Sequence, residues 1–419
     1  METRAIYDLI RKNGCSTDTR TLASGQVFIA LKGENFDANE LALTAIEQGA
    51  SYAVVDSPVL QKNDQCIVVT NTHETLKELA IIHRHTFSIP IIVIGGSNGK
   101  TTTKELTKAV LQKRYRTHAT NGNFNNDIGV PLTLLNMPID TEIAVIEIGA
   151  NHPGEHTELM TIASPTHVLI TNNGADHLEG FGTLEGVRKA NKEIYDMAQS
   201  QHAHVFVNKD IEYLIEDSAH LERTLYPTKP YASTSSLYAS VCYDDTDLTT
   251  SLFGSYNEPN ILAAIAIGEY FDVPLLDIQQ AIKEYVPSLK RSQILTRDTY
   301  SIVLDCYNAN PSSMEVALRD FARDTTPGHR FFIIGDMLEM GTDESRLHKE
   351  ILHLVESLTS TGDTVWCIGP RFSAYKADFP FTFFETTTTP REIFGTLDLT
   401  GKTVFLKASR GIKLENVVM

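Results

Sequence analysis

The stretch PIIVIGGSNGKTTTKE, residues 90–105, constrains the fold of this chain more strongly than any other. Residues 91–94 form an apolar run long enough for one buried parallel strand. A glycine turn follows, and from Thr101 the pattern becomes helical, with Leu106 and Val110 on one face. The order strand, glycine loop, helix is typical of phosphate binding, because amide groups of the loop and of the helix N-terminus surround a polyphosphate.

The residues of this loop have separate expected roles. We predict that Lys100 reaches the β- and γ-phosphates and that the Thr101 hydroxyl ligates Mg²⁺. The general phosphate-loop pattern places its first glycine at position 94, where this chain has Ile94, so the loop is the shorter GGSNGKTT. A chance glycine turn before a helix is the weaker alternative. The predicted ATP-binding residues of the loop are Gly96, Ser97, Asn98, Gly99, Lys100, Thr101 and Thr102.

Composition narrows the class of protein. The length of 419 residues predicts two to four domains, and 42% hydrophobic with 21% charged residues is typical of a soluble globular protein. The net charge of −17 argues against nucleic acid or an anionic membrane as the main partner. No apolar stretch approaches the roughly 20 residues of a membrane span. The N-terminus has no apolar segment typical of a signal peptide. We therefore expect a cytoplasmic protein and a monomer, although the sequence carries no direct sign of its oligomeric state.

The five cysteines are scattered and include no CxxC pair. This distribution indicates reduced thiols in a cytosol and disfavours zinc, because no cluster has ligand spacing.

Residues 1–85 form the first expected unit. Segments 26–32 and 52–56 have the pattern of strands, and 42–48 has that of a helix between them. The polar run STDTR, residues 16–20, is expected on a loop before the first strand. On composition alone, a turn with an N-cap is the simpler interpretation of this run.

The pattern breaks around residues 83–90, and the second unit, 86–290, alternates strands with helices. This alternation predicts an α/β fold with a parallel sheet covered by helices. In open sheets of this kind the ligand lies at the carboxyl ends of the strands. The expected strands include 91–94, 143–148, 167–171 and 204–207.

Three polar features lie at that edge of the predicted sheet. Glu147 ends an apolar strand and is costly to bury without a cation. Mg²⁺ brought by ATP is one such cation, and a core lysine or arginine is the alternative. His177 follows the next strand, and sharing this edge favours a metal or phosphate role over a surface or capping role. The loop 121–131, which contains Asn125, is rich in Gly and Asn and suits contacts with a ligand.

Residues 231–250 are expected to form short strands and turns. An alanine-rich helix then opens near Asn257 and Asn260, which either cap that helix or face a nucleotide. The third unit, 291–419, has a helix from Ser313 and predicts a second doubly wound sheet without a glycine phosphate loop. Its expected strands are 302–306, 330–334, 364–368 and 403–407.

Runs from all three units together resemble one enzyme family. They are STDTR, GQVFIALKGENFDAN, GSNGKTT, NFNNDIGVPLTLL, IEIGANHPGEH, TNNGADHLEGFGTLEGV, DCYNANPSSM, GDMLEMG and FLKASRG. The chain resembles the ATP-dependent Mur ligases of bacterial cell-wall synthesis over nearly its whole length. The GKTT loop alone would fit any member of the superfamily, including folylpolyglutamate synthetase. IGANHPGE, YNANPSSM and GDMLEMG are the specific runs, and they resemble the member that adds D-alanyl-D-alanine.

The resemblance implies a fold and a reaction. It implies a domain for a UDP-sugar (1–85), a central P-loop ATPase-like domain (86–290) and a C-terminal Rossmann-like domain (291–419) that closes over the site. ATP would phosphorylate the C-terminal carboxylate of UDP-MurNAc-tripeptide, and the amine of D-Ala-D-Ala would attack the acyl phosphate. ATP and Mg²⁺ are the implied cofactors. Such a reaction needs positioning and charge neutralisation rather than a protein nucleophile.

The resemblance also implies roles in the central unit. Lys100, Glu147 and His177 would be catalytic, with Thr101 and Glu147 on Mg²⁺ and His177 on a second Mg²⁺. The implied substrate-binding residues are Asp18, Thr19 and Arg20 for the uridine diphosphate, together with Asn125.

Further roles concern the nucleotide. Asn257 resembles an asparagine near the adenine, although the histidine that usually precedes it is Tyr256 here. Asp305 and Asn308 resemble residues that touch ribose and adenine. Arg291 resembles the arginine that reaches the γ-phosphate.

One position departs from the family pattern. In most members a lysine fourteen residues after the histidine is N-carboxylated and bridges magnesium, but counting from His177 gives Asn191, flanked by Lys189 and Lys192. Consecutive helix residues point about 100° apart, so Lys192 cannot replace Asn191 without a shift in the helix. We predict that the chain works without a carbamoylated lysine. A register shift that brings in Lys192 is the alternative.

Two other functions stay open at this point. A folate- or amino-acid-extending ligase would share GKTT and His177 but would have no reason to carry YNANPSSM. From a different class, a nucleotide-binding scaffold or an amidotransferase-coupled partner would keep the ATP site without ligating peptides. The sequence does not distinguish meso-diaminopimelate from lysine at the third position of the tripeptide.

Overall fold

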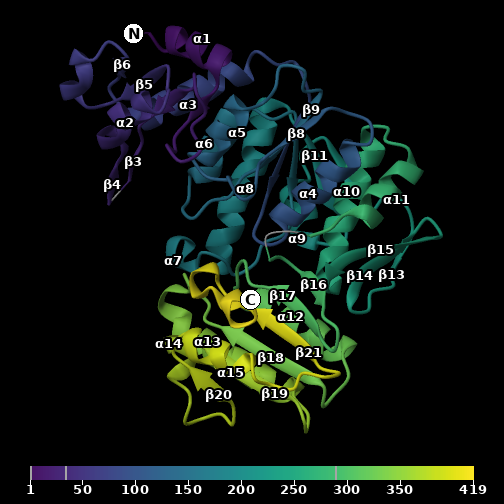
Figure 1. The fold of residues 1–419 in the computed structure, drawn as a ribbon. Helices are drawn as coiled ribbons and strands as arrows, with labels where there is room; N and C mark the ends of the chain where they lie inside the picture. Colours follow the sequence, from purple (N-terminus) through teal and green to yellow (C-terminus); the bar gives the residue numbers. More distant parts are fainter. Residues whose placement is uncertain (1, 34, 288–289) are drawn as a thin grey trace.

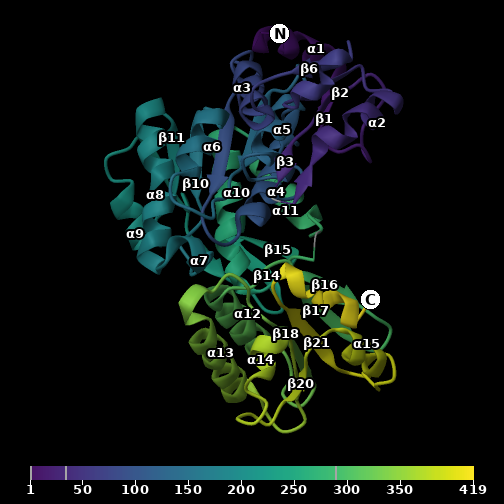
Figure 2. The same cartoon turned by 90° about the vertical axis from the view of Figure 1, so that its left-hand side faces the viewer.

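The computed structural model describes residues 2–33, 35–287 and 290–419, so positions 1, 34, 288 and 289 of the expected units lie outside the described residues. Its larger sheets follow one another along the chain, from the purple N-terminal unit through the teal and green centre to the yellow C-terminal unit (Figure 1). The view turned by 90° shows the same succession (Figure 2). Two parallel sheets and a third sheet of mixed parallel and antiparallel strands, with helices between the strands, confirm the α/β fold class.

The first sheet has four parallel strands in the order β1-β2-β5-β6. The expected strand at 26–32 is shorter, Val27–Ile29, and a two-residue strand, Cys15–Ser16, precedes it. Ser16 of the STDTR run lies in that short strand, which the sequence did not predict, and residues 17–20 lie in the loop before Val27–Ile29, as predicted. The elements of this unit are α1 (Thr3–Asn13), β1 (Cys15–Ser16), β2 (Val27–Ile29), β3 (Lys32–Gly33), β4 (Phe36–Asp37), η1 (Ala38–Leu41), α2 (Ala42–Glu47), β5 (Tyr52–Val55), η2 (Pro58–Lys62), β6 (Cys66–Val68) and α3 (Thr72–Arg84).

The second sheet has six parallel strands in the order β12-β11-β10-β7-β9-β8. Along β7 the side chains alternate between two cores, with Ile91 and Val93 in one and Ile92 and Ile94 in the other, because successive strand residues face opposite sides. The strands are β7 (Ile91–Gly95), β8 (Thr117–Ala119), β9 (Ile143–Glu147), β10 (His167–Ile170), β11 (His204–Asn208) and β12 (Arg223–Tyr226). The helices are α4 (Lys100–Leu111), α5 (Gly129–Leu135), α6 (Glu155–Ala163), α7 (Leu178–Phe181), α8 (Leu184–Gln201), α9 (Glu212–Asp217), η3 (Ser255–Asn257), α10 (Glu258–Tyr270) and α11 (Leu275–Glu284).

The third sheet has nine strands in the order β13-β14-β15-β16-β17-β21-β18-β19-β20. The strands are β13 (Tyr231–Ser233), β14 (Tyr238–Tyr243), β15 (Thr246–Phe253), β16 (Gln293–Thr296), β17 (Ser301–Asp305), β18 (Arg330–Gly335), β19 (Thr364–Ile368), β20 (Thr382–Phe384) and β21 (Thr403–Lys407). The helices are α12 (Pro311–Asp324), η4 (Gly341–Asp343), α13 (Glu344–Leu358), α14 (Pro370–Ser373), α15 (Thr388–Phe394), η5 (Arg410–Ile412) and η6 (Leu414–Val417).

Strands β13 to β15 connect the second and third units. The Leu252–Gln293 pair joins β15 to β16 of the third unit. Val241 and Leu248, however, pack in the same core as α10 and α11 of the second unit. One sheet therefore crosses the limit expected at 290/291, and that limit, like the one at 85/86, stays a prediction.

The helix expected from Ser313 begins two residues earlier, at Pro311. The side chain of Asn310 accepts a hydrogen bond from the amide of Ser313, whose hydroxyl bonds the backbone of Asn310 in return. This capping box satisfies two amide groups that the helix geometry leaves without a partner. In the described part of the chain, no helix combines the length and apolar character needed to cross a bilayer.

Candidate active site

A cavity of about 1490 Å³ is lined by residues of all three units. Most predicted site residues line it, although they come from positions nearly 300 residues apart. Those that do are Asp18, Ser97, Asn98, Gly99, Lys100, Thr101, Thr102, Asn125, Glu147, His177, Asn257, Arg291, Asp305 and Asn308. The predicted residues Gly96, Thr19, Arg20, Asn191 and Lys192 are not among the lining residues.

The glycine loop joins β7 to α4 and is held by the segment after β10. The amides of Ser97 and Asn98 donate to the backbone and side-chain oxygens of Asn172. Gly96 has φ 111°, and a Cβ there would lie 2.5 Å from the Thr171 hydroxyl, so only glycine fits. The first amides of α4 have no intrahelical partner and face an anion with the positive end of the helix.

Lys100 begins α4 and curls back over its own loop. Its ammonium donates to the carbonyl oxygens of Gly96 and Ser97, at 2.5 and 3.0 Å. Burial lowers the pKa of Lys100, and the positive charge of Arg291 lowers it further. The negative charges of Asp176 and Glu147 raise it, but the net shift of the pKa is downward. A polyphosphate in the cavity would favour the charged form, because an opposite charge raises the pKa of a lysine.

Glu147 ends β9 and is almost fully buried. Its Oε1 accepts from the Thr101 hydroxyl at 3.0 Å and from the Asn125 amide at 2.9 Å. Its Oε2 has no hydrogen-bond partner among the described residues. The buried Lys104 lies 3.6 Å from Oε2 but is itself bonded to two carbonyls and Glu105. Glu147 therefore has the buried lysine partner that was the alternative to Mg²⁺. Its Oε1 contacts the Thr101 hydroxyl, while its Oε2, to which no described residue donates a hydrogen bond, is available to a cation.

This arrangement fits a divalent cation such as Mg²⁺, which prefers oxygen ligands and usually takes only one or two from a protein. Over residues 2–33, 35–287 and 290–419, no group of three His, Cys, Asp or Glu side chains is placed to hold a metal. A cation at Glu147 would therefore depend on Thr101 and on ligands brought by the nucleotide.

His177 links the second and third units. It has a left-handed backbone, φ 47°, and occupies the N-cap position of α7 without a capping hydrogen bond from its side chain. Its Nδ1 lies 2.6 Å from Oε2 of Glu339, in the GDMLEMG run. This hydrogen bond lowers the pKa of Glu339. His177 therefore contributes to contact between the units as well as to the cavity.

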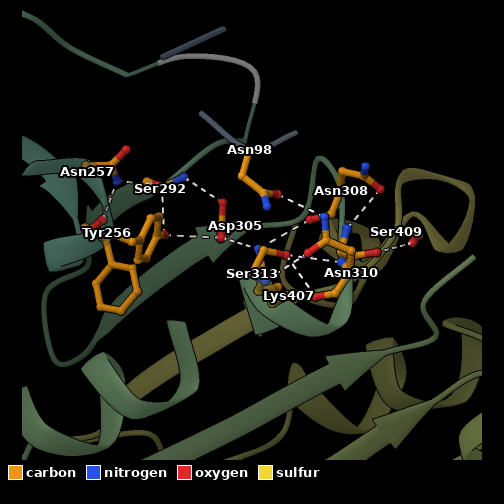
Figure 3. A network of polar contacts seen from close by, with 12 residues as sticks. Asn98, Tyr256, Asn257, Ser292, Asp305, Asn308, Asn310, Ser313, Lys407 and Ser409 are labelled. Atoms are coloured by element: carbon orange, nitrogen blue, oxygen red, sulfur yellow. Dashed lines mark hydrogen bonds and ion pairs between the residues drawn. The ribbon is translucent and has the colours of Figure 1, made fainter. Parts of the chain in front are cut away.

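A second contact reaches the phosphate loop itself. The amide of Asn310 donates to Oδ1 of Asn98 at 2.9 Å, and the Ser312 hydroxyl accepts from the amide of Ala175 at 3.3 Å. Figure 3 shows Asn310, the N-cap residue of α12, with Asn98 on one side and Ser313 on the other. The start of α12 is thus held against the glycine loop.

Asp305 lines the cavity, and its carboxylate already has hydrogen-bond partners. Oδ2 pairs with the Lys407 ammonium at 2.5 Å and accepts from the Tyr256 hydroxyl at 3.3 Å. Oδ1 accepts from the amide of Ser292 at 3.0 Å. Tyr256, at the position of the usual histidine, therefore joins the third unit to the second (Figure 3). Ribose contacts by Asp305 and Asn308 stay predictions.

Asn257 is buried beside this network. Its amide donates to the carbonyl of Phe253 and to the Ser292 hydroxyl, and its Oδ1 accepts from Asn260. The side chain makes no capping bond to α10, so the capping interpretation of Asn257 is wrong. A contact with adenine stays a prediction.

Arg291 stacks on Tyr307, with Cζ 3.4 Å from the ring centroid. Its Nε has no hydrogen-bond partner in the part of the chain that the structure describes. Arg410 approaches the same ring, with Cζ at 5.3 Å. Sequence reasoning assigned no role to Tyr307, Lys407 or Arg410, although YNANPSSM and FLKASRG contain them.

In the first unit, Asp18 alone of the three candidates lines the cavity. Its carboxylate pairs with Arg20, 2.6 Å away, and this hydrogen bond lowers the pKa of Asp18 to about 2. The Arg20 side chain is 86% exposed. Other residues of this unit at the cavity are Cys15, Ser16, Thr17, Thr21 and Gln26.

Asn191 and Lys192 point in different directions, as helix geometry requires. Asn191 is buried, and its amide donates to Oδ1 of Asn173, a lining residue, at 2.6 Å. Lys192 is partly exposed and pairs with Asp196. The register shift that would bring Lys192 into the site is absent from the described helix α8.

A glycine phosphate loop on a parallel sheet, facing a second α/β unit across a cavity, defines an α/β protein of the nucleotide-binding phosphate-loop class. Residues 94–268 match the family description "Mur ligase middle domain", and residues 290–397 match "Mur ligase, glutamate ligase domain". The chain belongs to the Mur ligase family.

Individual relatives agree with this assignment. The UDP-N-acetylmuramoyl-tripeptide–D-alanyl-D-alanine ligase of Bacillus subtilis is 33% identical over 98% of this chain and 93% of its own length. The Escherichia coli protein of the same name is 34% identical over 82% of this chain and 78% of its own. A crystal structure of MurF from Acinetobacter baumannii has a TM-score of 0.84 at 27% identity, covering 96% of this chain and 92% of that one. MurF from Thermotoga maritima, solved with ADP, has a TM-score of 0.82 at 24% identity, with 96% of each chain covered.

Proposed function

We propose that this chain is the ATP-dependent ligase that joins D-alanyl-D-alanine to UDP-MurNAc-tripeptide in peptidoglycan precursor synthesis. The observation that carries the proposal is likeness over 98% of the chain to a relative of that name. The cavity is compatible with it, because one space lies against the glycine loop and against residues of all three units.

The reaction that the family resemblance implies is compatible with this geometry. Lys100 and the first amides of α4 would hold the ATP phosphates while an oxygen of the tripeptide carboxylate attacks the γ-phosphorus and ADP leaves. The dipeptide amine then attacks the acyl carbon, loses a proton, and expels inorganic phosphate as the amide forms. Asn310 would fix Asn98 and with it the glycine loop. This positioning is what a reaction without a protein nucleophile requires.

Thr101 and Glu147 are proposed to hold Mg²⁺, supported by the unpartnered buried Oε2 of Glu147. The cation would neutralise phosphate charge in the transition state. His177 is proposed to bind or orient a second Mg²⁺, with its Nδ1 hydrogen-bonded to Glu339. We further propose a cytoplasmic monomer that does not bind nucleic acid.

The test is phosphate release from ATP with each substrate omitted in turn. We expect turnover only when UDP-MurNAc-tripeptide and D-Ala-D-Ala are both present. Folylpolyglutamate synthase of Mycobacterium tuberculosis shares the fold at 14% identity and a TM-score of 0.62. Turnover with a folate and glutamate in place of the two substrates would contradict the proposal. A nucleotide-binding scaffold would release no phosphate under any combination.

A further inference from the structure

The charged side chains that line the cavity are mostly paired. Asp18 pairs with Arg20, Asp305 with Lys407, and Glu339 with His177. Three cations in the lining have no carboxylate within 4 Å among the described residues. They are Lys100, Arg291 and Arg410.

Two of these cations belong with the nucleotide loop. Lys100 is part of it, and Arg291 lies near enough to Lys100 for its charge to act on that lysine. We assign Lys100 to the phosphates of ATP, and Arg291 resembles the arginine that reaches the γ-phosphate. Arg410 comes from the segment after β21 and shares Tyr307 with Arg291.

The backbone under Arg410 is held on two sides. The hydroxyl of Ser409 accepts from the amide of Leu338 at 2.9 Å and donates to the carbonyl of Ala309 at 3.2 Å. Residues 407–409 are buried, whereas Arg410 itself is exposed. The side chain therefore extends from a fixed point and is accessible at the cavity.

Most of the hydrogen-bonding capacity of Arg410 is unused. One of its NH groups donates to the Tyr307 hydroxyl at 3.3 Å. A guanidinium has five N–H donors in a fork that matches both oxygens of a carboxylate. Its anchoring by Tyr307 reduces the conformational entropy lost when it binds such a group.

The proposed acceptor substrate carries a carboxylate that takes no part in bond making. D-Ala-D-Ala carries its reacting amine at one end and a free carboxylate at the other, about 7 Å away when extended. We propose that Arg410 binds the terminal carboxylate of the incoming dipeptide and is a specificity-determining residue of this ligase. The inference rests on the proposed function. Arg410 takes no part in bond making and selects an acceptor with a charged C-terminus.

The experiment compares D-Ala-D-Ala with its C-terminal amide, which keeps the reacting amine and removes the negative charge. Activity is measured for wild type, Arg410→Gln, Arg410→Lys and the control Arg391→Gln. Arg391 lies on α15 in the same unit, is exposed and does not line the cavity. The KM for ATP and for UDP-MurNAc-tripeptide is measured alongside.

We expect wild type to prefer the acid over the amide by about 10- to 100-fold in kcat/KM, the usual range for a charged hydrogen-bonded pair. Arg410→Gln should reduce this preference to less than about 3-fold, mainly through the dipeptide KM, and leave the ATP KM nearly unchanged. Arg410→Lys should retain part of the preference, and Arg391→Gln all of it.

Three results overturn the inference while leaving the proposed function in place. They are an acid-to-amide ratio near one in active wild type, an undiminished preference in Arg410→Gln, and a rise in the ATP KM of that variant without a rise for the dipeptide. The first needs no variant, so the test survives any failure of Arg410→Gln to fold. Absence of ligation by wild type with any dipeptide would instead overturn the proposed function, and the inference with it.

Discussion

Lys100→Ala should separate catalysis from folding in this protein. The ammonium contacts only two carbonyl oxygens of its own loop and forms no ion pair with a carboxylate among the described residues. Its loss should therefore cost about 1 kcal/mol of stability or less. Loss of a positioned charge on the transferring phosphoryl group should raise the activation barrier by about 3–4 kcal/mol, or roughly 10²–10³ in kcat.

The assay is ADP release at saturating ATP, with urea unfolding measured on the same preparations. Lys108→Ala is the matched control, because Lys108 lies on the same helix and does not line the cavity. Near-normal kcat for Lys100→Ala at saturating ATP would refute the assignment. A large loss of stability in Lys100→Ala would contradict the prediction that Lys100 acts in catalysis and contributes little to folding.

Three further predictions concern the metal, the departure at position 191 and the third unit. Glu147→Gln should keep the fold but raise the Mg²⁺ concentration for half-maximal turnover by about tenfold or more, since a neutral amide is a poorer ligand; an unchanged Mg²⁺ titration would count against the site. Lys192→Ala should stay active with or without added acetate, and a nearly dead variant restored by acetate would identify a carbamoylated lysine. Asp363→Asn should cost about 3 kcal/mol by urea unfolding, because it leaves the buried Arg330 without its partner. Burial raises the pKa of Asp363, but hydrogen bonds from Arg330 and backbone amides outweigh this and lower it. Because its pKa is lowered, the Asp363 carboxylate stabilises the fold above a pH of about 3.8, and this stabilisation is lost as the pH falls through the folded pKa. The free energy of unfolding of Asp363→Asn should therefore fall less steeply in acid than that of wild type. Equal acid dependence in both proteins would contradict this.

The pattern of apolar and glycine residues along the sequence was sufficient to predict the glycine loop and the fold class. Strand β7, the loop and α4 occupy the positions that apolar periodicity predicts, since one strand buried on both faces and one amphipathic helix are properties of contiguous residues. The sequence also singled out Glu147 as a candidate site residue, because a carboxylate at the end of an apolar strand needs a compensating partner. The strand Cys15–Ser16 was missed because a two-residue strand has no periodicity to detect.

Sheet membership was decided by tertiary structure. Residues 231–253 lie before the expected third unit, but their last strand, β15, pairs with its first strand, β16. Hydrophobic alternation predicts which face of a strand is buried, but not which distant edge offers free hydrogen-bonding groups.

The contacts between units were likewise beyond reach of the sequence. Asn98 meets Asn310, and His177 meets Glu339, across more than 160 residues of chain. Arg410 lies near Tyr307 only because β21 pairs beside β17, which brings the ends of both strands to one edge. The residues expected to bind phosphate could be predicted from the sequence, because they form one contiguous motif. The cations left to bind a second substrate became apparent only once the fold had paired the others, because charge neutralisation depends on distance in space rather than along the chain.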